Sequence, residues 1–231
     1  QRNISYSQAL KEAQETGLAE ANPFLDVSGM DSAHKLTILA SLAFEQWLDL
    51  DAIPVTGIDT LKTLDIQYGS ELGYIIKLLA VATRLNGKIC LRVRPAFISR
   101  QHPLAWVSGP FNAISVYGHV TGHTMYYGRG AGGSPTSSAV AADMVSAAIG
   151  TQQTFFDTLG LWADRTPRAQ QASTDELVSR FYLRFMITDT VGVLAKIAAV
   201  LGENYISIAS VLQKEMPENR ENLSIAPVVI I

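Results

Sequence analysis

Two stretches of alternating hydrophobic character lie next to each other in the chain and are joined by a two-residue turn. Residues 74–85 and 88–99 are rich in the β-branched and aromatic residues that strands favour, and Asn86-Gly87 separates them. Asn-Gly is the strongest short hairpin signal, because both of its residues tolerate a positive φ. Periodicity alone would also allow a helix at 74–85, but the turn favours a strand. The pattern therefore predicts an antiparallel hairpin.

Further segments follow the period of a helix or of a shorter strand. Ser5 and Gln8 match a capping box and predict a short helix that ends near Thr16. Loop signals fill residues 18–30. Residues 31–47 carry apolar side chains on nearly every side of a helix, which predicts a buried helix. Two strands and a helix of small residues complete this part of the chain, at 113–120, 123–127 and 136–149.

The end of the chain has a separate β-α-β-β order that predicts a small module. Its first two strands are expected at 181–187 and 205–213. Asp189 or Thr190 is expected to cap the intervening helix, which ends near Leu201. A polar loop then precedes the terminal apolar run; these two segments are expected at 217–222 and 228–231.

A polar segment with Thr-Pro, Gln-Gln and Ser-Thr pairs separates the module from the rest and predicts a linker. We therefore expect an α+β fold in which a mixed or antiparallel sheet is covered by helices, followed by a small ferredoxin-like module. The expected boundaries are 1–150 for the first domain, 151–178 for the linker and 179–231 for the module.

Composition and charge argue against several classes of partner. The 231 residues carry a net charge of −3 with no Lys/Arg cluster among aromatic residues, so no nucleic acid partner is expected. No apolar run approaches the roughly 20 residues that span a bilayer, and no signal-peptide pattern is present, so no membrane partner is expected. The single Cys90 cannot form an internal disulfide, which suits a reducing, cytoplasmic setting. The four His residues lack metal-ligand spacing, so no metal site is expected.

Three acidic residues and one lysine are concentrated where the chain enters the second helix. Asp31 and Lys35 are four residues apart and share one helix face, and Glu20 and Asp26 precede them in the loop. Carboxylates can hold the α-ammonium group of an amino acid, and a lysine can donate a proton to a reacting oxygen. The simpler alternative is that Asp31 caps the helix and pairs with Lys35 on a solvated surface. Residue chemistry alone leaves both interpretations open.

The same stretch resembles the homoserine dehydrogenase family at every fixed position of its signature, which are Ala13, Gly17, Asn22-Pro23, Asp26, Gly29, Asp31 and Lys35. The resemblance implies an NAD(P)-dependent oxidoreductase of threonine, methionine and isoleucine biosynthesis that interconverts L-aspartate 4-semialdehyde and L-homoserine. It also implies that Glu20 and Asp31 bind the amino-acid substrate, that Asp26 lines the pocket and that Lys35 is the catalytic proton donor. Leu18 departs from the family, in which many members carry Tyr.

A glycine-rich turn at 128–133 precedes the predicted helix of small residues. Small residues let backbone N–H groups approach a phosphate or a ring at a helix N-terminus; the simpler alternative is a tight turn that needs a positive φ. The turn resembles the family's cofactor-side turn, which implies cofactor contacts from four of its residues: Gly128, Gly130, Gly132 and Thr136.

The dinucleotide fingerprint G-x-G-x-x-G does not occur in the chain, which begins at Gln1 rather than Met. The resemblance implies that a nucleotide-binding domain precedes this region. NADPH or NADH, and a monovalent cation, would then be bound mainly by residues outside this sequence. We therefore expect a sequence that is cut at both ends and inactive by itself.

The terminal module resembles an ACT domain, a small amino-acid-binding regulatory fold. The similarity rests on Asp189, Gly192, Val193 and Leu194 after a strand, and on Ile206-Ser207-Ile208. It implies an allosteric site at 189–194 for an amino-acid effector, with L-threonine the expected ligand. The family also pairs its subunits, which implies a homodimer or tetramer. An ordinary helix cap and a small packing residue are the simpler alternative for the module.

Two other functions fit the same scaffold. One is a catalytically silent amino-acid-binding regulatory protein, and the other is the dehydrogenase part of a fused aspartate kinase. The trailing module argues against the fusion, whose regulatory domains usually precede this region. An upstream G-x-G-x-x-G unit would distinguish a dehydrogenase from the silent scaffold.

Overall fold

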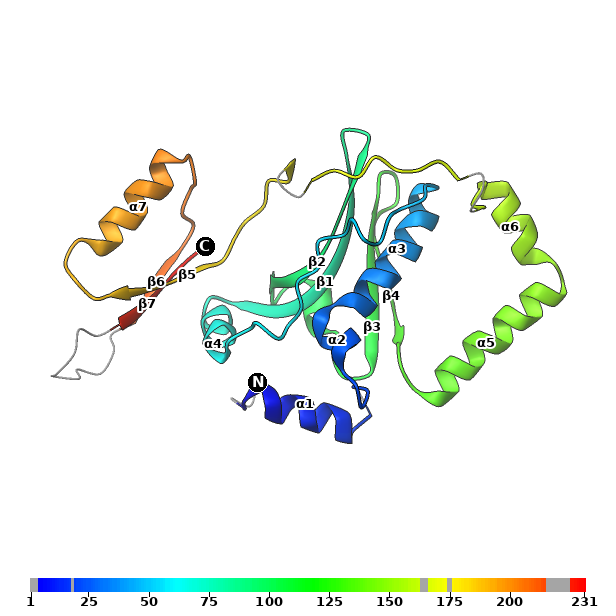
Figure 1. The fold of residues 1–231 in the computed structure, drawn as a ribbon, viewed down its shortest axis with the longest axis horizontal. Helices are drawn as coiled ribbons and strands as arrows, with labels where there is room; N and C mark the ends of the chain where they lie inside the picture. Colours follow the sequence, from blue (N-terminus) through cyan, green and yellow to red (C-terminus); the bar gives the residue numbers. More distant parts are fainter. Residues whose placement is uncertain (1–3, 18, 163–165, 174–175, 215–224) are drawn as a thin grey trace. The chain divides into compact units, whose positions relative to one another are not determined.

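A computed structural model describes residues 4–17, 19–162, 166–173, 176–214 and 225–231 (Figure 1). The chain divides into two compact units, Gln1–Glu176 and Leu177–Ile231. Both combine helices with small antiparallel sheets, as expected for the α+β class. Leu18, where the signature stretch departs from the family, and the predicted loop at 217–222 lie outside the described residues.

The first hairpin of the first unit confirms the prediction from its turn. Strands β1 (Tyr74–Leu85) and β2 (Lys88–Ser99) pair antiparallel over their whole length. The turn residues Asn86 and Gly87 have φ values of 50° and 82°. Positive φ at both central positions is the type I′ geometry, whose twist matches that of the flanking strands.

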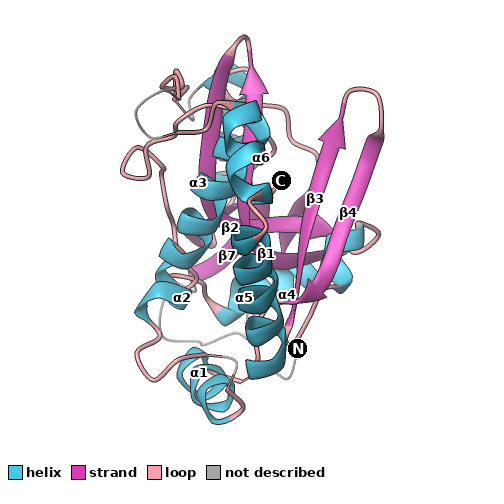
Figure 2. Ribbon diagram, turned by 90° about the vertical axis from the view of Figure 1, so that its right-hand side faces the viewer, coloured by secondary structure: helices cyan, strands magenta, loops and turns pink. Residues whose placement is uncertain are grey.

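Helix α3 (Met30–Phe44) packs on this hairpin and forms the main core with it (Figure 2). Its buried residues contact buried positions of β2 and of the connection after the helix; the cluster is Ala33, Leu36, Ala40, Leu48, Ile53, Ile89, Leu91 and Val93. The prediction of a helix buried on all sides is wrong, because Ile38 is 63% exposed and Leu39 is 42% exposed. A helix lying on one face of a hairpin is covered on one side only. It also ends earlier than expected, at the left-handed residue Glu45.

Helix α1 (Tyr6–Glu15) confirms the N-terminal helix prediction, because the Ser5 hydroxyl accepts a 3.2 Å hydrogen bond from the Gln8 backbone N–H. Four short helices were not predicted: α2 (Phe24–Ser28), α4 (Thr63–Glu71), the 3-10 helix η1 (Pro103–Trp106) and α6 (Thr151–Leu159). Helix α6 lies within the segment that was expected to be a linker. Its Thr- and Gln-rich sequence gives no clear helix signal. Two glycines with left-handed φ, Gly150 and Gly160, mark its N-cap and C-cap.

A second hairpin and a helix follow in the same unit. Strands β3 (Phe111–Gly118) and β4 (Gly122–Arg129) pair antiparallel as a separate two-stranded ribbon, seen on the right of Figure 2. The predicted strands at 113–120 and 123–127 therefore exist with shifted ends. Helix α5 (Gly133–Ala148) begins within the glycine-rich turn, three residues before the predicted start.

The second unit has the predicted β-α-β-β order. Its strands are β5 (Leu183–Thr188), β6 (Val211–Gln213) and β7 (Ile225–Ile230), in the antiparallel order β5-β7-β6, with α7 (Val193–Glu203) between β5 and β6. Its core joins buried Leu201, Val228 and Ile230 to half-buried residues of β5. The strand expected at 205–213 is reduced to its last three residues.

The predicted side-chain cap of α7 by Asp189 or Thr190 is wrong. The helix begins later, and its N-cap is Gly192 with φ of 88°, a position without a side chain. The carboxylate of Asp189 instead accepts a 3.3 Å hydrogen bond from the Gln213 side chain on β6. Asp189 therefore links the start of the loop to the sheet.

Three findings on the described residues concern the cysteine, membrane-crossing helices and metal-binding groups. Cys90 is buried and unpaired, and burial raises the pKa of its thiol, so the reactive thiolate is disfavoured. Within the described part of the chain, no helix has both the length and the apolar character needed to cross a membrane. Nor do the described residues contain three or more His, Cys, Asp or Glu side chains grouped so as to hold a metal ion.

Candidate functional site

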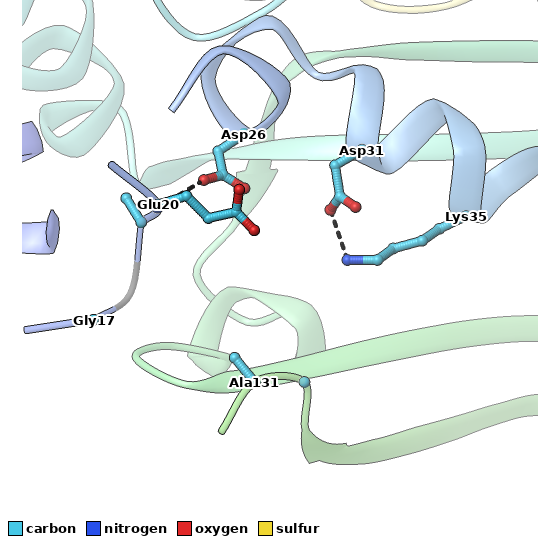
Figure 3. Close-up of a pocket in the computed structure, with 8 residues that line it drawn as sticks. Gly17, Glu20, Asp26, Asp31, Lys35 and Ala131 are labelled. Carbon is cyan, nitrogen blue, oxygen red and sulfur yellow. Dashed lines mark hydrogen bonds and ion pairs between the residues drawn. The ribbon is translucent and has the colours of Figure 1, made fainter. Parts of the chain in front are cut away.

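The acid- and lysine-rich stretch forms one wall of a pocket of about 410 Å³ (Figure 3). Its lining comes from the loop after α1, from α2, from the first turns of α3 and from the turn after β4: Gly17, Ala19, Glu20, Asp26, Asp31, Lys35, Gly130 and Ala131. The pocket thus brings together the four polar residues singled out in the sequence. It also brings Gly130, which is distant in sequence, to the same site.

Asp31 and Lys35 form an ion pair on the pocket side of α3. The Lys35 Nζ lies 2.6 Å from Asp31 Oδ2, and the two side chains are 58% and 41% exposed (Figure 3). Asp31 is not the cap of α3, because the N-cap is Gly29 with φ of 84°. Of the simpler interpretation, the helix cap by Asp31 is therefore wrong, whereas the exposed pair with Lys35 is present. An exposed i,i+4 pair contributes little to stability, so the pair is available for other interactions.

Glu20 and Asp26 are held beside each other by the backbone. Asp26 lies on α2, and its Oδ2 accepts a 3.4 Å hydrogen bond from the Glu20 backbone N–H. The side-chain amide of Gln14 donates to the carbonyl oxygens of Glu20 and Ala21, at 3.0 and 3.2 Å. Sequence analysis missed both α2 and Gln14. No motif marks Gln14, because its role depends on a loop that folds back onto α1.

Helix α2 is kept in place by close approach of another segment. A Cβ atom at Gly57 would lie 2.2 Å from the Val27 carbonyl oxygen and 2.8 Å from Ser28 Cα. The next residue, Ile58, donates a 2.8 Å backbone hydrogen bond to the same Val27 carbonyl. Only glycine allows this contact, so Gly57 is a further residue on which the position of Asp26 depends.

Of the four turn residues that were predicted to contact a cofactor, all of which the structure describes, only Gly130 lines the pocket. A Cβ at Gly130 would lie 1.9 Å from the amide nitrogen of Asn112, so the turn packs on that side chain. Gly132 has φ of 124° and is the N-cap of α5, and its carbonyl accepts the Thr136 N–H. Gly128 is the penultimate residue of β4.

The charges of the pocket favour a cationic group of a small ligand. Three carboxylates face one ammonium group, which leaves a formal excess of negative charge. Such a wall attracts the α-ammonium of an amino acid by charge-assisted hydrogen bonds. The ammonium group of Lys35 in the same lining can donate a hydrogen bond to a polar oxygen.

The candidate effector residues lie at the start of α7 in the second unit. Gly192 caps the helix, Val193 donates its N–H to the Thr190 carbonyl at 3.3 Å, and Leu194 is 38% exposed. Asp189 is bonded to β6 as described above. A helix N-terminus with a glycine cap leaves backbone N–H groups accessible to an anion.

The fold and the pocket define an α+β protein with an acidic site suited to a small zwitterionic ligand. A family model described as homoserine dehydrogenase matches residues 1–145. The homoserine dehydrogenase of Helicobacter pylori is 41% identical over 92% of this chain and 49% of its own length. That of Bacillus subtilis is 36% identical over 98% of this chain and 51% of its own length.

Solved structures give the same result. A homoserine dehydrogenase from Thiobacillus denitrificans superposes with a TM-score of 0.84 at 35% identity, over 99% of this chain and 52% of that one. A hyperthermophilic archaeal homoserine dehydrogenase in complex with NADPH gives 0.50 at 27% identity, over 63% of this chain and 41% of that one. The chain belongs to the homoserine dehydrogenase family, and it spans about half the length of these relatives.

Proposed function

We propose that this chain supplies the amino-acid side of a homoserine dehydrogenase active site. The protein would interconvert L-aspartate 4-semialdehyde and L-homoserine with NADPH or NADH. The observation that carries the proposal is the convergence of Glu20, Asp26, Asp31 and Lys35 with Gly130 in one pocket. Relatives at 36–41% identity bear this enzyme's name.

The proposed roles are substrate binding for the three carboxylates and proton transfer for the lysine. Glu20, Asp26 and Asp31 hold the substrate α-ammonium group, and Asp31 also forms an ion pair with Lys35. Lys35 gives its proton to the alkoxide oxygen, directly or through one water. A bound nicotinamide would supply the hydride. Gly130 would lie on the cofactor side of the pocket, and most of the cofactor and a monovalent cation would be bound outside this sequence.

The full-length gene product tests the proposal. It is mixed with L-homoserine and either NADP⁺ or NAD⁺, and formation of the reduced cofactor is followed by absorbance. Turnover with L-homoserine and none with L-serine supports the proposal. Calorimetric binding of homoserine without turnover under either cofactor would instead identify a catalytically silent amino-acid-binding protein.

We also propose that the chain forms a homodimer through its sheets. The complete protein would be that dimer or a tetramer built from it. One face of the β3–β4 hairpin presents Ile114, Val116 and Tyr126, which are 43%, 44% and 66% exposed. Exposed apolar faces of this kind are covered in stable proteins. Sedimentation at micromolar concentration should give a dimer, and Val116→Asp should shift it to monomer. A wild-type monomer would show that this face does not drive assembly.

The second unit is proposed to be a regulatory module of the ACT type. An end-product amino acid, with L-threonine the first candidate, would bind near 189–194 with its carboxylate at the start of α7. Because inhibition requires different affinities in the active and inactive states, threonine should lower activity at saturation. Calorimetry on the full-length gene product measures the binding. Absence of binding of threonine, methionine and isoleucine at millimolar concentration would make the module structural.

A further inference from the structure

Glu20 lines the pocket, although it belongs to no helix or strand. It lies in the connection between α1 and α2, and its side chain is exposed. The other charged residues of the pocket are different in this respect, because Asp26 belongs to α2 while Asp31 and Lys35 belong to α3. The direction of the Glu20 carboxylate therefore depends on what holds the backbone of the connection.

The backbone of Glu20 is held on both sides by side chains. On one side, its N–H donates to Asp26 Oδ2 at 3.4 Å. On the other side, its carbonyl accepts from Gln14 Nε2 at 3.0 Å. The same Gln14 nitrogen reaches the Ala21 carbonyl at 3.2 Å, so both of its N–H groups are used on consecutive residues.

Helix α1 is an exposed helix that meets this loop near its C-terminal end. All ten of its residues are described, and none of them is buried. Two backbone hydrogen bonds also join the connection to the end of α1: the Ala19 N–H donates to the Ala13 carbonyl at 3.1 Å, and the Gly17 N–H donates to the Gln14 carbonyl at 3.1 Å. Gln14 is half-buried beneath the connection, and its amide is the polar side-chain group of α1 that meets Glu20 and Ala21.

We propose that Gln14 is a positioning residue for the amino-acid substrate and that it acts through Glu20. The inference rests on the proposed function. The Gln14 amide donates hydrogen bonds to two successive carbonyls and so fixes the orientation of the Glu20 peptide. That orientation directs the Glu20 carboxylate into the pocket. Lys35 and Asp31 lie on α3, outside this arrangement. Loss of Gln14 should therefore weaken substrate binding while proton transfer continues.

The test compares two isosteric changes in the full-length gene product. Gln14→Met removes both donors, and KM for L-homoserine should rise about 5- to 30-fold, as expected for two hydrogen bonds. Gln14→Glu turns an acceptor toward the two carbonyls and should raise KM further. In both variants kcat should stay within about threefold of wild type and KM for the cofactor within about twofold, since neither depends on Glu20.

The matched control is Gln8→Met, the same change on the same helix, where the side chain is exposed. It should leave every constant unchanged. A homoserine KM within twofold of wild type in both Gln14 variants would overturn the proposal. So would parallel loss of kcat and cofactor affinity, or a Gln14→Met protein that fails to fold when Gln8→Met folds, because either marks a purely structural role. A wild-type protein that does not oxidise homoserine rejects the proposed function itself, before the variants are compared.

Discussion

Replacing Lys35 with alanine should lower kcat of the full-length gene product by about 10²–10⁴-fold, the usual contribution of a positioned acid or base. Lys35 is the cation of the pocket wall, and its Nζ is held 2.6 Å from Asp31 Oδ2. The affinity for NADPH should change little, because most of the cofactor is proposed to be bound outside this sequence. Steady-state kinetics with a separate cofactor titration measures both quantities.

The chain offers a close control for the loss of a helical ion pair. Lys11 lies 3.9 Å from Glu15, also four residues away, on the exposed helix α1. Lys11→Ala removes a lysine of the same kind outside the pocket and should leave kcat unchanged. If Lys35→Ala retains kcat within threefold of wild type, the proton-donor role is wrong. If Lys11→Ala loses as much activity as Lys35→Ala, the effect is not specific to the site.

Gly57→Ala should destabilise the first unit by about 1–3 kcal/mol, the usual cost of overpacking. The new methyl group would lie 2.2 Å from the Val27 carbonyl oxygen and 2.8 Å from Ser28 Cα. Both are backbone atoms of α2, which cannot move aside as the end of a flexible side chain can. The melting temperature should fall by roughly 2–4 °C for each kcal/mol of lost unfolding free energy in a protein of this size. Because α2 carries Asp26, KM for homoserine should rise as well.

Gly202→Ala is the matched control for this substitution. Gly202 lies in α7, and a Cβ there would meet no atom within 4 Å. Alanine at an open helical position should be neutral or stabilising by up to about 1 kcal/mol. An unchanged melting temperature and homoserine KM in Gly57→Ala would show that α2 can shift without consequence, and that Gly57 does not position Asp26.

Local sequence was sufficient for the elements whose geometry depends on adjacent residues. Asn86-Gly87 predicted the turn and register of the first hairpin, because positive φ at both residues admits few other structures. Ser5 and Gln8 located the start of α1, because the hydroxyl of an N-cap serine accepts the backbone N–H three residues later. The spacing of Asp31 and Lys35 placed them on one face of α3, since residues four apart meet in any α-helix.

The short helices were beyond local reasoning. Helices α2 and α6 have five and nine residues, too few to show a clear period, and such helices owe their stability to tertiary contacts. The start of α7 was misplaced because Asp189 had two available partners. Its bond to Gln213, 24 residues away, prevailed over the helix cap.

The sequence by itself determined the family of this chain, its acidic and lysine residues, and their order along one helix and the loop before it. Tertiary structure decided which distant segments complete and support the pocket. It brought Gly130 into the pocket lining, set Gly57 against the backbone of α2 and placed the Gln14 amide on the Glu20 carbonyl. Gly57 has no left-handed φ and Gln14 belongs to no motif, so their roles arise only when distant segments pack together.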